Sequence, residues 1–158
     1  MTAAARSRPS NFSHLAIGVS DMDVSLAFYR DTIGLDVSKD VIEDFRDVPG
    51  FSTYRRGVYL RWAVGDGEAF LVLDQTLSDH GDRGQAKQLF TIGMHHFGFW
   101  VDDTDAIVER ARQAGYAVVI EPATGDSKDY GEDAGRPIRT AFIRDPDGNI
   151  VQLDQRLD

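Results

Sequence analysis

Apolar residues alternate with small or polar residues in two short segments of the chain. Residues 14–21 read His-Leu-Ala-Ile-Gly-Val-Ser-Asp, and residues 96–103, 82 positions later, read His-Phe-Gly-Phe-Trp-Val-Asp-Asp. A period of two is typical of a strand with one buried face, because side chains alternate across a strand. The repeat therefore predicts two equivalent strands, each with a bulky apolar face and a roomier face that begins with a histidine.

A helical pattern follows each predicted strand. Apolar residues recur at helical spacing within residues 24–28 in the first half and within residues 107–114 in the second. We expect the first helix to end near Gly34 and the second at Gly115, because glycine readily adopts the left-handed conformation that ends a helix. Side-chain oxygens suitable for capping the first turns belong to Ser20 or Asp21 and to Asp103 or Thr104.

The remaining segments give both halves the same order of elements. Further strands are predicted at residues 35–41, 58–64, 116–120 and 139–144. Each half ends on Leu-Asp-Gln, at residues 73–75 and 153–155. We therefore predict an α+β fold in which two paired β-α-β-β-β modules form a cup-shaped curved sheet with helices outside.

This interpretation divides one structural domain into four segments. Residues 1–11 are expected to be a mobile N-terminal segment, residues 12–76 the first module, residues 77–92 a linker and residues 93–158 the second module. The polar stretch 122–137 is interpreted as an ordinary mobile loop, and the alternative is a loop that covers a site.

The two strand histidines are the main candidates for chemistry. His14 and His96 begin the roomier faces, and a curved sheet made from both halves would bring them together. Two imidazoles on facing strands suit a divalent metal ion such as Fe, Ni, Mn, Co or Zn. Gln152 is the third candidate ligand, whereas Val72 at the equivalent position cannot bind a metal. Hydrogen-bonded core histidines and an empty polar pocket are the alternatives.

Four apolar side chains are predicted to share the face that carries the histidines. They are Phe70, Val72, Trp100 and Phe142. Aromatic rings at such positions can stack against a small molecule, so we expect these residues to line a substrate pocket. In the alternative interpretation they belong only to the core.

Composition and charge narrow the range of partners. Lys and Arg total 17 against 26 Asp and Glu, and the net charge of −9 disfavours nucleic acid. No apolar segment reaches the roughly 20 residues needed to span a bilayer. The chain has no cysteine, which excludes disulfides and thiolate metal sites and fits a reducing cytoplasm, where we expect the protein. The first ten residues lack the apolar core of a secretory signal.

Three segments resemble the vicinal oxygen chelate superfamily, which includes glyoxalase I, methylmalonyl-CoA epimerase, extradiol dioxygenases and the fosfomycin- and bleomycin-resistance proteins. They are residues 14–35, residues 93–103 and the segment Asp-Pro-Asp-Gly-Asn-Ile-Val-Gln-Leu at 145–153. The resemblance extends from about residue 12 to residue 155. It implies paired modules that form a cup around one metal ion, a small-molecule ligand and a homodimer.

The resemblance implies two kinds of function. The one we favour is a metal-dependent enzyme of the glyoxalase or dioxygenase type, which chelates a small oxygen-rich substrate through adjacent oxygens, with His14, His96 and Gln152 as ligands. Glyoxalase- and epimerase-type members carry acids where this chain has Val72 and Gln152, and extradiol enzymes carry a tyrosine where it has Phe142, so no catalytic base is assigned. The alternative is a non-catalytic small-molecule binder of the bleomycin-resistance kind, which needs no metal.

Overall fold

The computed structural model describes residues 11–49, 53–63, 68–78, 88–90 and 92–157. Module 1 consists of β1 (His14–Gly18), α1 (Met22–Leu26) with its π-helical continuation η1 (Ala27–Ile33), β2 (Asp36–Asp44), β3 (Tyr54–Arg61) and β4 (Phe70–Thr76). Module 2 consists of β5 (Phe97–Trp100), α2 (Thr104–Gln113), β6 (Val118–Asp126), the 3-10 helix η2 (Ser127–Tyr130), β7 (Pro137–Arg144) and β8 (Ile150–Arg156). The predicted α+β fold with two β-α-β-β-β modules is confirmed. None of the helices in these ranges is long and apolar enough to cross a membrane.

Each module forms its own four-stranded mixed sheet. The strand orders are β1-β4-β3-β2 and β5-β8-β7-β6, and in both sheets the first pair is parallel and the other pairs are antiparallel. Within the described ranges, β1 and β5 each pair on one side only, so both are edge strands. The registers place His14 opposite Phe70 and Gly98 opposite Gln152.

The stretch 122–137 was predicted to be a loop, but much of it forms regular secondary structure. Its first part continues β6 as far as Asp126, which pairs with β7 although this stretch lacks an alternating apolar pattern. Its middle part forms η2, and the Asp126 side chain accepts a hydrogen bond from Lys128 N at 2.9 Å at the start of that helix. Backbone pairing and this local cap organise the segment, and neither leaves a hydrophobic period in the sequence.

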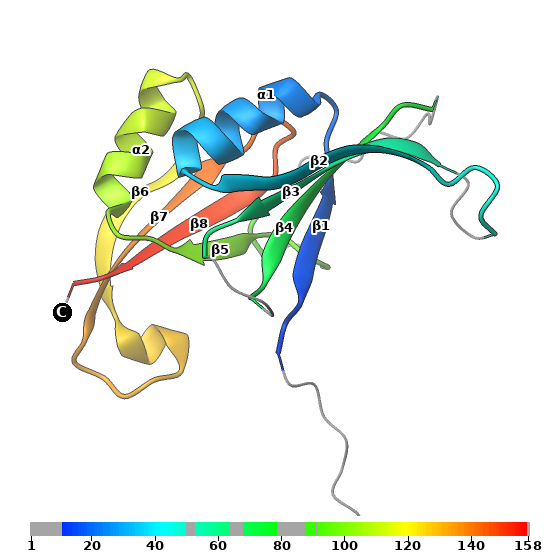
Figure 1. Cartoon of the computed structure of the whole chain (residues 1–158). Coiled ribbons are helices and arrows are strands. Elements are labelled where there is room, and N and C mark those ends of the chain that lie inside the picture. Colours follow the sequence, from blue (N-terminus) through cyan, green and yellow to red (C-terminus); the bar gives the residue numbers. More distant parts are fainter. Residues whose placement is uncertain (1–10, 50–52, 64–67, 79–87, 91, 158) are drawn as a thin grey trace, which may run out of the picture.

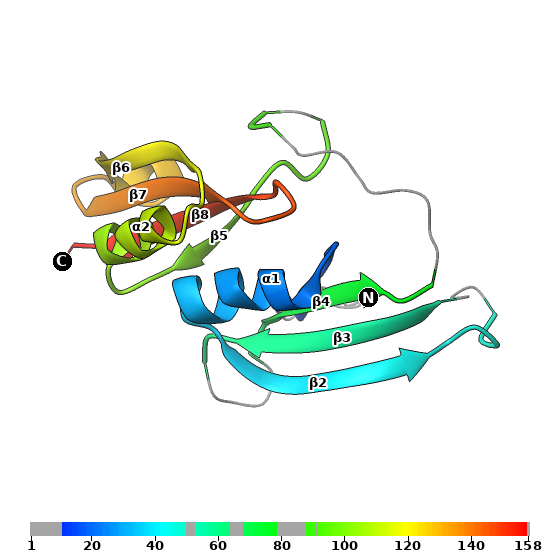
Figure 2. The same cartoon turned by 90° about the horizontal axis from the view of Figure 1, so that it is seen from above.

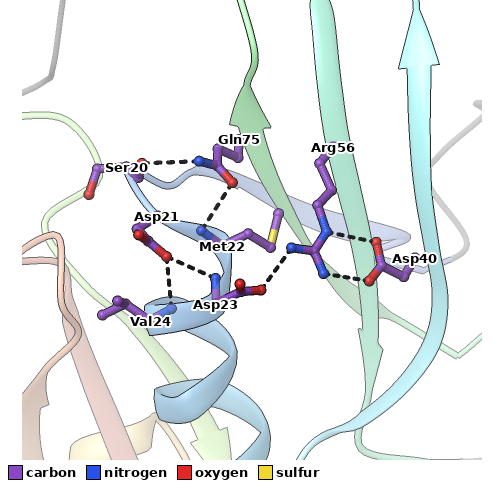
Figure 3. Close-up of polar contacts among 8 residues, drawn as sticks. All are labelled: Ser20, Asp21, Met22, Asp23, Val24, Asp40, Arg56 and Gln75. Atoms are coloured by element: carbon purple, nitrogen blue, oxygen red, sulfur yellow. Dashed lines mark hydrogen bonds and ion pairs between the residues drawn. The ribbon is translucent and has the colours of Figure 1, made fainter.

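The Gln of each repeated Leu-Asp-Gln segment fixes the start of a helix. Gln75 Oε1 accepts a hydrogen bond from Met22 N at 3.1 Å, and Gln75 Nε2 donates to the carbonyl of Ser20 (Figure 3). Gln155 Oε1 accepts from Thr104 N at 3.1 Å in module 2. Asp21 is the N-cap of α1 and Asp103 that of α2, as predicted.

An ion pair connects each helix to the middle of its sheet. Arg56 of β3 donates to Asp23 in α1 at 2.8 Å and to Asp40 in β2 at 2.7 Å (Figure 3). Arg139 of β7 donates to Asp105 in α2 at 2.8 Å. The repetition of these pairs shows that part of the internal repeat preserves the attachment of helix to sheet.

The two modules share one hydrophobic core through their helix sides. The cluster contains, from module 1, Ile17, Leu26, Phe28, Leu60 and Leu73, and from module 2, Phe99, Ile107, Val108, Ile143 and Leu153. Buried polar contacts cross the same junction. Tyr29 Oη donates to Asp145 Oδ2 at 2.7 Å, and Arg110 Nε donates to the Thr32 carbonyl at 3.0 Å.

This junction determines where the other faces of the sheets point. Figure 1 shows α1 and α2 beside each other, and Figure 2 shows β2 and β3 on one side of α1 and β6, β7 and β8 on the other. Side chains alternate across each strand, so the residues that do not pack on the helices point away from the shared core. We call these surfaces the open face of module 1 and the open face of module 2.

The Tyr29–Asp145 contact allows a direct test of the junction. Tyr29→Phe removes a buried hydroxyl and leaves one oxygen of a buried carboxylate with fewer donors, so we expect the free energy of unfolding to fall by about 1–3 kcal/mol. Urea denaturation followed by circular dichroism measures this change. Tyr54→Phe, which alters a partly exposed tyrosine of β3, is the matched control. Equal effects of the two substitutions would contradict the role given to this contact.

Candidate functional site

The open face of module 1 carries three neighbouring rings, of which two are stacked and the third is tilted. His14 at the start of β1 stacks on Phe70 of β4, with ring centroids 5.2 Å apart and planes inclined by 17°. Tyr59 of β3 lies on the other side of Phe70 at 5.9 Å. The Arg61 guanidinium lies 4.6 Å from the centre of the Phe70 ring. We call His14, Phe70 and Tyr59 the aromatic floor.

Charged side chains border the aromatic floor. Lys39 of β2 lies 5.2 Å from the centre of the Tyr59 ring and 3.9 Å from Glu43. Arg55 donates to Glu43 at 2.8 Å and to Asp74 at 2.5 Å, so these carboxylates are already paired. Burial raises the pKa of Asp74, and the positive charge of Arg55 opposes that shift.

The open face of module 2 is organised around a buried carboxylate. Asp154 is 6% exposed and accepts hydrogen bonds from Tyr130 Oη at 2.6 Å, Thr140 Oγ1 at 2.9 Å and Gln152 Nε2 at 2.9 Å. These three donors come from η2, β7 and β8. Because several donors stabilise its charge, Asp154 holds neighbouring side chains in place.

His96 lies at the edge of this group. Its Nδ1 is 2.8 Å from Nδ1 of His95, and its ring meets Phe142 edge to face at 5.7 Å. Burial lowers the pKa of His96, and the neighbouring His95 lowers it further. The negative charge of Asp154 and a hydrogen bond that the His96 ring donates to Gln152 act in the opposite direction.

Trp100 provides the largest exposed aromatic surface on the open face of module 2. It is 52% exposed and lies beside Tyr130, with centroids 5.4 Å apart. The Arg156 guanidinium lies 4.3 Å from its ring centre, and Arg156 pairs with Glu132 at 2.6 Å. An exposed tryptophan beside a tyrosine and a guanidinium provides aromatic surface for contact with a planar molecule.

The structure distributes the predicted site residues over two surfaces. His14, Phe70 and Val72 belong to module 1, where Val72 is buried in β4 opposite Tyr59. His96, Trp100, Phe142 and Gln152 belong to module 2. Among the described residues no hydrogen bond or ring contact joins His14 to His96.

The metal site stays a prediction, and the side chains predicted to form it make contacts with other protein groups. Gln152 donates to Asp154 at 2.9 and 3.0 Å and to Tyr130 at 3.2 Å, and its remaining amide oxygen accepts from His96. Two of the three expected ligands are therefore bonded to each other. No group of three or more His, Asp or Glu side chains in the described ranges is arranged to hold a metal ion. Val72 offers no donor.

Two residues of the site were not predicted to take part in it. Asp154 repeats Asp74 at the end of the other half, and strand parity places it beside Gln152, so this signal was present in the sequence. Tyr130 follows a polar segment without any hydrophobic period. Its position depends on the 3-10 helix and on hydrogen bonds to distant strands, so no local pattern indicates it.

The comparisons with known proteins agree with this architecture. Residues 11–153 match the family model described as the Glyoxalase/Bleomycin resistance protein/Dioxygenase superfamily. The chain belongs to this superfamily. The resemblance found in the sequence is thereby confirmed, and superfamily members include enzymes and often bind divalent metals. No curated protein matches the chain.

Solved structures of this superfamily share the fold at low sequence identity. A glyoxalase family protein from Bacillus cereus superposes with a TM-score of 0.74 at 20% identity, covering 99% of this chain and 100% of the other. The trypanothione-dependent glyoxalase I of Leishmania major gives 0.62 at 22% identity, covering 93% and 86%. A glyoxylase/bleomycin resistance protein/dioxygenase domain from Frankia sp. EAN1pec gives 0.62 at 21% identity, covering 94% and 99%.

The environment of His96 predicts how stability depends on pH. Because its pKa is lower in the folded than in the unfolded chain, the unfolded chain binds more protons near and below the ordinary histidine pKa of about 6.5. The free energy of unfolding should therefore fall as the pH is lowered through this region, and His96→Gln should weaken the dependence. Histidine NMR titration measures the pKa directly, with the urea-unfolded chain as the control. A folded-state value at or above the unfolded one would refute this assignment.

Proposed function

We propose that this superfamily member binds a small molecule in a cup formed by two copies of the chain. In this arrangement the open face of module 1 from one copy lies opposite the open face of module 2 from the other. The observation that supports it is the junction through the helix sides, which turns both open faces away from the shared core. Module 1 carries three of the seven predicted site residues and module 2 carries four, so in this proposal a cup that uses all of them needs a second chain.

The edge strands support an association between copies. β1 and β5 each leave one side without a strand partner in the described part of the chain, and such edges favour pairing or covering by another molecule. Apolar side chains remain exposed nearby: Phe12 at 63% and Met94 at 54%. They line, together with Trp62 and Trp100, a cavity of about 350 Å³ between the modules. A second copy would cover these groups, and a homodimer is the assembly that we propose.

The chemistry of the open faces favours binding over proton transfer. Asp74 is paired with Arg55, and Asp154 accepts three hydrogen bonds, so neither carboxylate is placed as a general base. The remaining groups on these faces are the partly buried Phe70 and the exposed Trp100, each with a guanidinium beside its ring. These groups supply stacking and charge recognition, which a small-molecule binding protein needs.

A metal-dependent enzyme of the glyoxalase or dioxygenase type is the second candidate. The exposed ring of His14 favours it, because an accessible imidazole at this position is available to an ion in a two-copy cup. His14, His96 and Gln152 would then hold the metal, which would polarise adjacent oxygens of the substrate. We propose the cytoplasm as the location for either function, because a chain without cysteine suits a reducing compartment.

The cysteine-free sequence permits a sharp test of the two-copy cup. The double variant His14→Cys/His96→Cys, treated with a short bis-maleimide reagent, should give a covalent dimer of twice the chain mass in denaturing electrophoresis. The physical reason is that the two positions meet only between copies.

The two single variants are the controls for this experiment. A chain that carries only His14→Cys or only His96→Cys should give much less dimer at the same protein concentration, because each cup then holds one thiol. A cross-link within one chain, or no cross-link in a protein that remains folded, would refute the two-copy cup. Light scattering of the untreated protein gives the oligomeric state independently.

Metal content separates the two candidate functions. We expect the protein purified without chelator, and then incubated with Fe, Ni, Mn, Co or Zn, to retain substoichiometric metal after gel filtration, because Gln152 and His96 are bonded to each other and Val72 offers no donor. Gln152→Glu supplies a carboxylate and should increase retention, as measured by plasma mass spectrometry. One metal per chain, lost in His14→Ala/His96→Ala, would instead establish the enzyme candidate.

A further inference from the structure

We propose that the ligand is a planar organic anion, such as an aromatic carboxylate, held by Arg61 over the aromatic floor of module 1. This assignment rests on the proposed two-copy binding function and names the class of molecule that the cup accepts. Three features support it: Arg61 has no ion-pair partner among the residues that the structure describes, rings lie beside it, and the other charges around it are paired.

Arg61 differs from the other arginines of its sheet. Arg55 and Arg56 each bind two carboxylates, whereas Arg61 has no ion pair within the described part of the chain. Asp36 lies opposite Arg61 in the β2–β3 register, yet the two side chains are not paired. In a protein with 26 acidic against 17 basic residues, a strand arginine without a carboxylate has an unused capacity to bind an anion.

The ring beneath Arg61 holds its guanidinium ready for such an anion. The guanidinium lies 4.6 Å from the centre of Phe70, where the negative face of the ring stabilises its charge. A guanidinium in this position keeps its N–H groups available for a carboxylate, which it can bind through two parallel hydrogen bonds. His14 and Tyr59 extend the ring surface on both sides of Phe70.

The surrounding charges direct the anion to Arg61 rather than to its neighbours. Lys39 lies beside Glu43, and Arg156 on the open face of module 2 is paired with Glu132. Their charges are therefore partly neutralised. Trp100 on that same face would supply the opposite wall for a flat molecule. A ligand with a planar apolar body and one carboxylate can pack against the rings and form an ion pair with Arg61.

Calorimetric titration with a matched pair of probes tests this assignment. The probes are 2-naphthoate and its neutral analogue 2-naphthamide, added to the full chain at low salt. We expect 2-naphthoate to bind at least about tenfold more tightly, since a hydrogen-bonded ion pair is worth about 1.5–3 kcal/mol. Arg61→Gln should abolish this preference and leave the binding of 2-naphthamide nearly unchanged.

Two further variants separate charge from stacking. Arg112→Gln makes the same change of net charge on α2, away from the open faces, and should leave both titrations unaltered. Phe70→Leu should weaken both probes because it removes the central ring. Circular dichroism confirms that each variant is folded.

The outcomes distinguish this assignment from the proposed function. Equal binding of the two probes, or a preference that survives Arg61→Gln, overturns the anion assignment while the cross-linked dimer still supports the cup. Failure of both probes to bind a protein that forms the cross-link also overturns it. Failure of the cross-link itself refutes the two-copy cup, and a preference lost in Arg61→Gln would then belong to module 1 alone.

Discussion

The burial of both helix sides in one core is the constraint on which the rest of the structure depends. A β-α-β-β-β module has one apolar sheet face and one apolar helix stripe, and each module alone would leave part of this surface in water. Packing the two modules through these surfaces removes it from water and places Tyr29 against Asp145 in the junction. The same packing leaves the opposite faces of both sheets open. Chemistry in this chain is therefore restricted to surfaces that the core does not use.

Duplication has preserved the attachment of the helices more strictly than the open faces. Gln75 and Gln155 hold the first turns of α1 and α2 in the same way. On the open faces, by contrast, Asp74 is paired with an arginine whereas Asp154 is bound by hydroxyl and amide groups. The two halves of the cup are therefore chemically different. One offers a cation over rings, and the other an exposed Trp100 above a rigid polar group.

The sequence could predict the modules because their signals are local. Each of these signals involves residues that are close in the sequence. They are strand parity, helical spacing, the caps Asp21 and Asp103, and the turn in which Gly148 N donates to Asp145 O. The mutual placement of the modules depends on contacts between residues 78 and 116 positions apart, which no local pattern records. The sequence grouped His14 with His96, and the structure places them in separate sheets. Tyr130 is held by residues 10 and 24 positions away, and these contacts also leave no local pattern.

The net charge of the whole chain determines how Arg61 can act on a ligand. An acidic surface repels anions at long range, so an anionic ligand gains affinity only where a cation is close and is not already neutralised. The paired arginines contribute little to such a site because their fields are cancelled by the carboxylates they bind. The Arg61 guanidinium lies over Phe70, and no carboxylate in the described part of the chain cancels its field. Selection among small molecules then follows from two requirements that must be met together: a flat apolar surface for the rings and a negative group at its edge.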